Sequence, residues 1–172
     1  MDEKRDILVH FLAALAYRTQ KALRDAPESF AAFRVRSGVR TPHELVHHMT
    51  SVLGYARTFF IGGSYRPERL PSFREEVLRF HEMLESLGNH FKSEKQLIGI
   101  SPEQMIQGPL SDAMTHAGQL AMLRRLEGSG VPPENFVFAD ISPDNLGADQ
   151  PPPVSPDKEW PEGPRGGASR SE

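Results

Sequence analysis

Four stretches of the chain, each close to twenty residues long, carry apolar side chains at helical spacing. Apolar residues that recur at intervals of three and four lie on one side of a helix, so each stretch predicts an amphipathic helix with one buried face. One β-branched and aromatic run, residues 135–141, has no second run to pair with and is expected to be an extended segment packed on the helices. We therefore expect an all-α protein, a four-helix bundle, with helices at residues 6–24, 42–61, 73–91 and 109–128.

The expected bundle ends where the composition changes. At 172 residues the chain is long enough for one domain with a core of its own, and we assign residues 1–148 to that domain. Residues 149–172 are rich in proline and glycine. Such a composition predicts an irregular or polyproline-like C-terminal tail.

Composition also excludes several classes of function. The formal net charge of −3 argues against a protein that binds nucleic acid mainly through its phosphates. The sequence shows neither an apolar run long enough to span a bilayer nor a secretory signal pattern, so we expect a cytoplasmic protein of bacterial type without a membrane partner. The absence of cysteine excludes disulfides, thiolate metal ligands and a cysteine nucleophile.

Two of the predicted helices carry clear boundary signals. Thr41, followed by Pro42 and then by Glu44, has the pattern of a capping box with proline at the first helical position. Pro109 suits the first turn of the last helix, because its missing N–H would have no partner there in any case. Gly128 is a natural end for that helix.

The predicted second helix contains a match to a zinc-protease motif. Residues 43–47 (HELVH) follow the pattern in which two histidines one turn apart bind zinc and a glutamate acts as base. However, His43 and His47 fall on the polar side of this helix, in line with Thr50 and Gly54. We interpret the match as fortuitous and expect both histidines to face solvent.

Three other residues favour a metal site. Asp112 and His116 lie one turn apart on the last helix, so their side chains project from the same face. His48 lies on the apolar side of the second helix with Leu45 and Met49, where an imidazole needs a hydrogen bond or a metal. The set suits an open catalytic metal site, and the alternative is a hydrogen-bonded His–Asp network without metal.

Two segments resemble a known family. TPHELVHHM (residues 41–49) and GPLSDAMTHAGQLAMLRR (residues 108–125) look like the DinB/YfiT-like superfamily of bacterial four-helix-bundle metalloproteins. The resemblance covers the chain from the first helix to Gly147 and leaves the tail outside. Its most specific part is the His-x-Gly-Gln signature that begins at His116, with Leu-Arg-Arg behind it.

The resemblance implies a ligand set from which this chain departs at one position. In that family three histidines hold a divalent metal, and two of them match His48 and His116. The third falls on Asp112. Because a carboxylate oxygen is a competent ligand for zinc, nickel, manganese or iron, we expect the site to be retained with two imidazoles and one carboxylate.

The same resemblance implies a function. Characterised relatives use a metal together with a low-molecular-weight thiol, so we expect a metal-dependent enzyme that activates a thiol or water, of the thiol S-transferase or hydrolase type. Its substrate would be a small molecule, and Gln119 and Tyr55 are candidate polar groups lining the site. The alternative is a non-catalytic, stress-associated metal-binding protein.

Assembly is expected to be homodimeric. Relatives in the resembled family often pair through the bundle. In the tail, Val154 and Trp160 are large apolar side chains with few partners in their own sequence neighbourhood. These two observations favour a symmetric contact between two copies of the chain.

Overall fold

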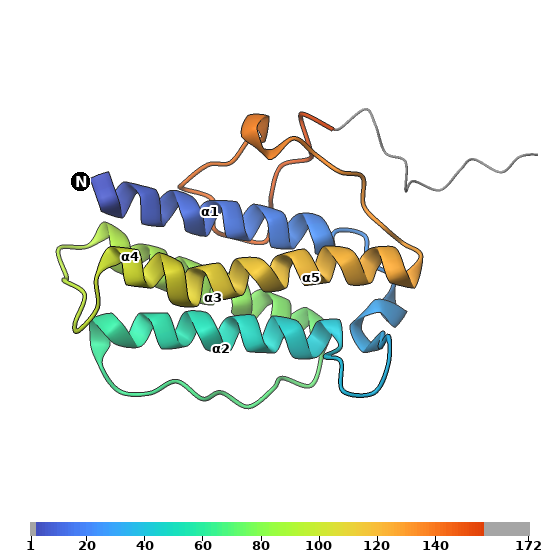
Figure 1. Ribbon diagram of the computed structural model, residues 1–172, viewed down its shortest axis with the longest axis horizontal. Helices are drawn as coiled ribbons and strands as arrows, with labels where there is room; N and C mark the ends of the chain where they lie inside the picture. The colour runs from blue at the N-terminus through green and yellow to red at the C-terminus, as the bar shows by residue number, and fades with distance from the viewer. Residues whose placement is uncertain (1–2, 157–172) are drawn as a thin grey trace, which may run out of the picture.

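The described part of the chain is all-helical, as expected. A computed structural model of the protein describes residues 3–156. Within these residues there are four long helices, and β-structure is limited to one isolated bridge between Glu134 and Pro156. The elements, shown in Figure 1, are α1 (Glu3–Leu23), η1 (Glu28–Ala32), α2 (Pro42–Ile61), α3 (Phe73–Lys92), α4 (Pro102–Met105), η2 (Ile106–Leu110), α5 (Ser111–Glu127) and η3 (Phe136–Phe138).

Local sequence accounts for most helix ends. Thr41, Ser72 and Ser101 each form a capping box at the start of a helix, in which the hydroxyl accepts from the backbone N–H three residues on. Gly62 and Gly128 end α2 and α5 with φ of +72° and +99°, a region that favours glycine. The boundaries predicted for the second and third helices therefore agree with the structure to within one residue.

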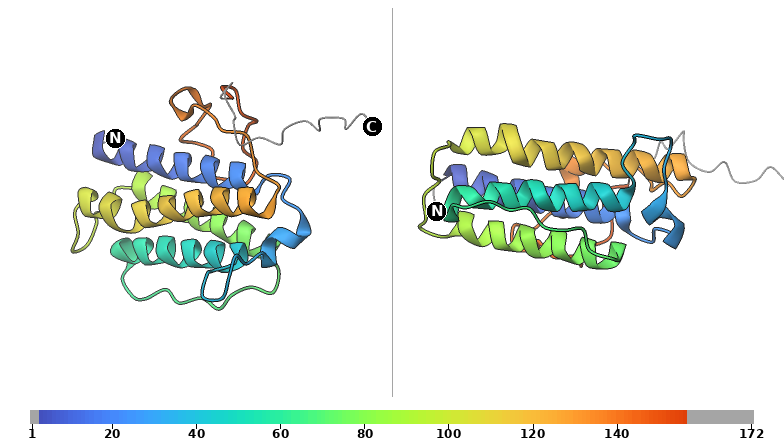
Figure 2. Two further views of the ribbon diagram at one scale, coloured as in Figure 1. Left: turned by 45° about the vertical axis from the view of Figure 1, so that its right-hand side comes forward. Right: turned by 90° about the horizontal axis from the view of Figure 1, so that it is seen from below.

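The four long helices pack around one core. α2 contacts α3 and α5, and α1 contacts the same two helices, so α1 lies diagonally opposite α2. Figure 2 shows this arrangement from two further directions. The core contains fully buried side chains from every long helix, among them Leu12, Leu53, Phe80 and Leu120. The α2–α5 contact matters most here, because both helices carry predicted site residues.

The last helix begins after a kink, which agrees with the predicted start at Pro109. Gly108, in the π-helical turn η2 between α4 and α5, has a non-helical backbone (φ −94°, ψ −105°), and Pro109 follows it directly. Proline removes an intrahelical donor and opens the hydrogen-bond ladder, which explains the irregular turn. Asp112 lies in the first turn of α5, and the short helix α4 precedes the kink.

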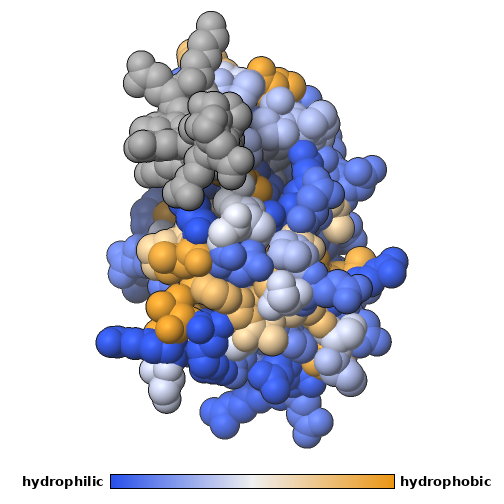
Figure 3. Space-filling model, turned by 90° about the vertical axis from the view of Figure 1, so that its right-hand side faces the viewer, coloured by the Kyte–Doolittle hydropathy of each residue, from blue (hydrophilic) through white to orange (hydrophobic). Residues whose placement is uncertain are grey.

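One end of the bundle is closed by η1 and the loop that follows it. Residues 33–41 run from η1 to the capping box of α2, and residues 38–40 lie beside both α2 and α5. Figure 3 views the molecule towards this end, where a mostly hydrophilic surface surrounds apolar side chains.

The segment after α5 returns across the bundle. Glu134 accepts a hydrogen bond from the Tyr17 hydroxyl at 2.8 Å and pairs with Lys21 at 3.3 Å. His81 on α3 contacts the carbonyl oxygen of Leu146 at 2.8 Å. The predicted extended run at residues 135–141 contains the short turn η3, so it is only partly extended. Trp160, expected to contact a second subunit, lies outside the described residues.

Candidate metal centre

Three side chains from α2 and α5 meet at one point, and they are the three predicted as metal ligands. Nε2 of His116 lies 3.3 Å from Oδ1 of Asp112, and Nε2 of His48 lies 3.8 Å from Oδ2 of the same carboxylate. One ligand atom from each residue lies within 4.8 Å of the other two. The two imidazole rings are 4.8 Å apart between centroids and nearly perpendicular. This is the one group of three or more His or acidic residues in the described chain that could hold a metal ion.

Gln119 orients the His116 ring. Nδ1 of His116 lies 2.9 Å from the amide oxygen Oε1 of Gln119, one helical turn further along α5. The amide oxygen can accept from an Nδ1–H, and in that tautomer Nε2 is free to bind a metal beside Asp112. Gln119, predicted to line the site, makes this orienting contact.

His116 is buried, as expected of both histidines, but the rest of the group lies at the side of the bundle. The His116 side chain is 9% exposed, whereas those of His48 and Asp112 are 32% and 48% exposed. α2 presents its buried residues Leu45 and Met49 to the core and leaves His48 at the edge of that face. Two of the three ligands are therefore accessible from solvent.

Partial burial and nearby positive charge favour the neutral form of His48. Partial burial lowers the pKa of its imidazole below the usual value, the Arg40 guanidinium and His116 lower it further, and Asp112 opposes them. A metal binds the neutral imidazole, so a lowered pKa leaves the ligand ready at neutral pH.

Two hollows flank the group, one on each side of residues 38–40. The first has a volume of about 600 Å³ and is lined by polar and charged residues that include His48, Arg34, Arg40 and Arg69. The second, of about 500 Å³, has more apolar walls. It is lined by Gly38, Val39, Arg40, Leu45, His116, Gln119, Met122 and Leu123. Both hollows give a small molecule access to the candidate ligands.

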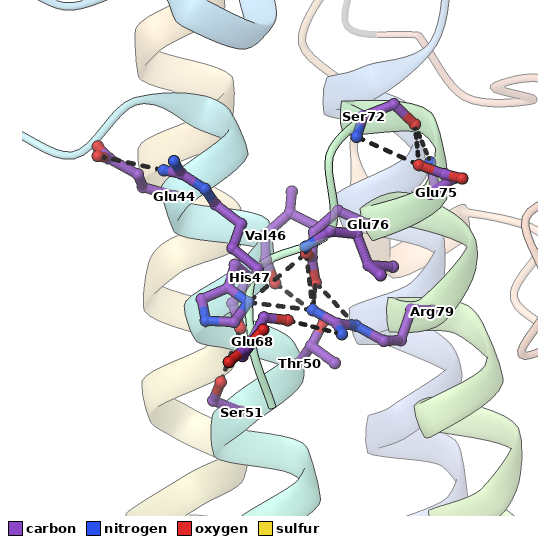
Figure 4. A network of polar contacts seen from close by, with 12 residues as sticks. Glu44, Val46, His47, Thr50, Ser51, Glu68, Ser72, Glu75, Glu76 and Arg79 are labelled. Carbon is purple, nitrogen blue, oxygen red and sulfur yellow. Dashed lines mark hydrogen bonds and ion pairs between the residues drawn. The ribbon is translucent and has the colours of Figure 1, made fainter. Parts of the chain in front are cut away.

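The prediction that His43 and His47 face solvent is wrong. Nδ1 of His47 lies 3.1 Å from Arg79 Nη2 and 3.5 Å from Glu76 Oε2. The carboxylate of Glu76 is fully buried, and Figure 4 shows the His47 ring and the Arg79 guanidinium directed towards it. His43 lies with its ring edge-on to Phe73, with centroids 5.9 Å apart.

The error has a tertiary cause. The connection between α2 and α3 runs along the polar side of α2, so that side is covered. Gly54 shows this closeness, because a Cβ placed there would lie 2.0 Å from the ring of Tyr65 in the connection. Glu44, the base of a zinc-protease motif, is held by the Thr41 backbone N–H and by Arg34. The interpretation of HELVH as a fortuitous match agrees with this geometry, since His43 and His47 join no metal-binding group in the described chain.

Two further residues were misjudged or missed. Tyr55 lies away from the site: it is 54% exposed, packs on Phe59 and lines neither hollow. Arg40 was not singled out, although it lines both hollows beside the candidate ligands. The available signal was the arginine-rich loop of residues 34–40, which has no motif that points to α2 or α5.

The comparisons with known proteins add no identification. Protein-family models, curated proteins and solved structures were each compared with the chain, and none matches. Among the described residues, the helices are too short or too polar to cross a membrane. Assignment of a function therefore depends on the site itself and on the two resembling segments.

Proposed function

We propose that the protein is a divalent-metal-dependent enzyme in which His48, Asp112 and His116 hold the metal. The proposed activity is transfer of a low-molecular-weight thiol to a small electrophile, or hydrolysis by activated water, as the DinB/YfiT-like resemblance implies. The observation that carries the proposal is the convergence of three ligand atoms within 4.8 Å, beside two open hollows.

The spacing of the ligand atoms suits a metal. Bonds of 2.0–2.1 Å at tetrahedral angles separate two ligand atoms by about 3.3 Å. Oδ1 of Asp112 lies 3.3 Å from Nε2 of His116, and Oδ2 lies 3.8 Å from Nε2 of His48. One ligand atom from each residue lies within 4.8 Å of the other two, so the side chains need only a small inward movement to hold one ion. No hydrogen bond within the described chain holds the His48 ring, so this ring can make the remaining adjustment. Two imidazoles and one carboxylate suit zinc, nickel, manganese or iron(II).

The residues around the ligands have distinct tasks. Gln119 orients the His116 ring and can accept from its Nδ1–H, which would leave Nε2 free for the metal, and the partly exposed Asp112 and His48 leave the outer side of the site open. A bound divalent cation would supply Lewis acidity that lowers the pKa of a coordinated thiol or water. Since the chain has no cysteine, any thiol must come from a co-substrate. Glu44 is a poor base, because hydrogen bonds from Thr41 hold its pKa below the usual value.

The experiment is metal stoichiometry, measured by mass spectrometry on protein purified without an affinity tag. We expect one divalent ion per chain in the wild type and strong loss in His48→Ala and His116→Ala. His10→Ala, which changes an exposed histidine on α1, is the matched control and should keep its metal. Full occupancy in His116→Ala would refute the ligand assignment.

A second measurement separates an enzyme from a metal-binding protein. The metal-loaded protein is mixed with a low-molecular-weight thiol and a small electrophile, and loss of free thiol is followed over time. We expect turnover that His116→Ala abolishes and that His10→Ala leaves intact. Stoichiometric metal without turnover of any thiol or hydrolysable substrate would instead support the non-catalytic alternative.

A further inference from the structure

The wall of the first hollow carries a concentration of positive charge beside the candidate ligand His48. The first hollow is lined by three guanidinium groups, those of Arg34, Arg40 and Arg69, and by one carboxylate, that of Glu44. This excess of positive charge stands out in a chain whose formal net charge is −3. A local positive field beside a pocket attracts anions.

The three arginines differ in how far they are neutralised. Arg34 and Arg69 both pair with the Glu44 carboxylate, at 3.0 and 3.5 Å. Arg40 pairs with no carboxylate in the part of the chain that the structure describes, and its residue is exposed. Its planar fork of donors is therefore available for an oxyanion.

Arg40 also stands where the two hollows meet. It lines the basic hollow together with His48, and it lines the more apolar hollow together with His116 and Gln119. The apolar hollow has Leu45, Met122 and Leu123 on its walls. A molecule with its charged end on Arg40 and an apolar body against these residues would lie beside His48 and His116, two of the three candidate metal ligands.

From this juxtaposition we propose that the site takes a small organic oxyanion, with its charged head on Arg40 and its apolar body in the second hollow. The chemical fate of the bound anion rests on the proposed function, whereas its binding does not. Recognition by Arg40 and by the apolar wall requires no metal, so binding of the anion can be measured on metal-free protein.

The test is calorimetric titration of the full chain, with and without metal, against three probes: acetate, hexanoate and inorganic phosphate. We expect hexanoate to bind metal-free protein more tightly than acetate, because only hexanoate has a body that can bury apolar surface. Arg40→Gln should weaken hexanoate binding at least about tenfold, the usual effect of losing a charge-assisted hydrogen bond. Arg36→Gln is the matched control, because Arg36 lies in the same loop and lines neither hollow.

The possible results test anion binding independently of metal binding. The role of Arg40 would be overturned if the wild type, Arg40→Gln and Arg36→Gln bound hexanoate with equal affinity. The role of the apolar wall of the second hollow would be overturned if the wild type bound acetate and hexanoate with equal affinity. Phosphate that binds through Arg40 as tightly as hexanoate would support the oxyanion site and identify phosphate as an accepted head group. Metal stoichiometry on the same preparations tests the proposed function, so absence of metal with intact Arg40-dependent binding would refute that function alone.

Discussion

The sharpest prediction concerns Asp112→Ala, which should remove metal-dependent stabilisation while destabilising the metal-free protein only slightly. Asp112 is the position at which this chain departs from the three-histidine pattern of the family that it resembles. Its carboxylate contacts the two histidines of the candidate site. If the carboxylate is a ligand, its removal should strongly weaken metal binding while the apolar face of α5 stays intact.

The expected magnitudes follow from where the residue lies. The Asp112 side chain is 48% exposed and lies in the first turn of α5, where a carboxylate interacts favourably with the helix dipole. The substitution should therefore lower the metal-free stability by about 0.3–1 kcal/mol, well below the effect of losing the metal. Metal at a hundred times its Kd stabilises the folded wild type by about 2.7 kcal/mol, which corresponds to roughly 5–10 °C in Tm for a chain of this size.

The assay is thermal unfolding with and without added Zn²⁺, followed by circular dichroism, beside metal stoichiometry. Asp112→His should restore three imidazoles and keep the metal-dependent rise in Tm. Glu82→Ala, which removes another exposed helical carboxylate, is the control and should behave as the wild type. Full occupancy and an unchanged metal-dependent Tm shift in Asp112→Ala would refute Asp112 as a ligand.

Three further predictions test the fold. Gly54→Ala should destabilise the protein by about 1 kcal/mol in denaturant unfolding, because the new Cβ would lie 2.0 Å from the Tyr65 ring and overpacking outweighs the helix propensity of alanine. In a Tyr65→Ala background the same change should stabilise, and an unchanged sign would contradict the explanation. In the folded protein burial lowers the pKa of His81, and this outweighs the opposite effect of its hydrogen bond to Leu146. As the pH falls, His81 is therefore protonated in the unfolded chain before it is protonated in the folded protein. The contribution of neutral His81 to the free energy of unfolding is therefore fully present above about pH 6.5 and is lost as the pH falls below that value. His81→Gln should reduce the change in the urea midpoint between pH 7.5 and pH 5. The homodimer, suggested in part by the exposed Val154, stays a prediction that light scattering on the full chain would refute by showing a monomer at all practical concentrations.

The positions of the helices could be predicted because the signals that define them are local. The capping box at Thr41 and the glycine at position 62 involve residues within one turn of the helix ends, and they mark the limits of α2. The signals before α5 are local as well. Gly108 breaks the helical backbone and Pro109 follows it directly, while a separate capping box at Ser101 starts the short helix α4 upstream.

The side of a helix that faces solvent could not be predicted in the same way. The polar side of α2 was taken as exposed, because polar side chains usually face water. The connection between α2 and α3 covers that side, and Arg79 on α3 and the buried Glu76 provide His47 with polar partners there. Whether a loop covers one side of a helix depends on the path of the loop in space, and this path cannot be inferred from the periodicity of the sequence within α2.

The candidate site combines both kinds of information. The sequence by itself determined that Asp112, His116 and Gln119 lie on neighbouring turns of one helix, because helical geometry fixes the direction of residues three and four apart. Only the tertiary structure decided that His48 comes within 3.8 Å of Asp112, that the group lies at the side of the bundle, and that Arg40 lies beside it. Those relations depend on how α2, α5 and the loop before α2 pack together, which is set by contacts between residues far apart in the chain.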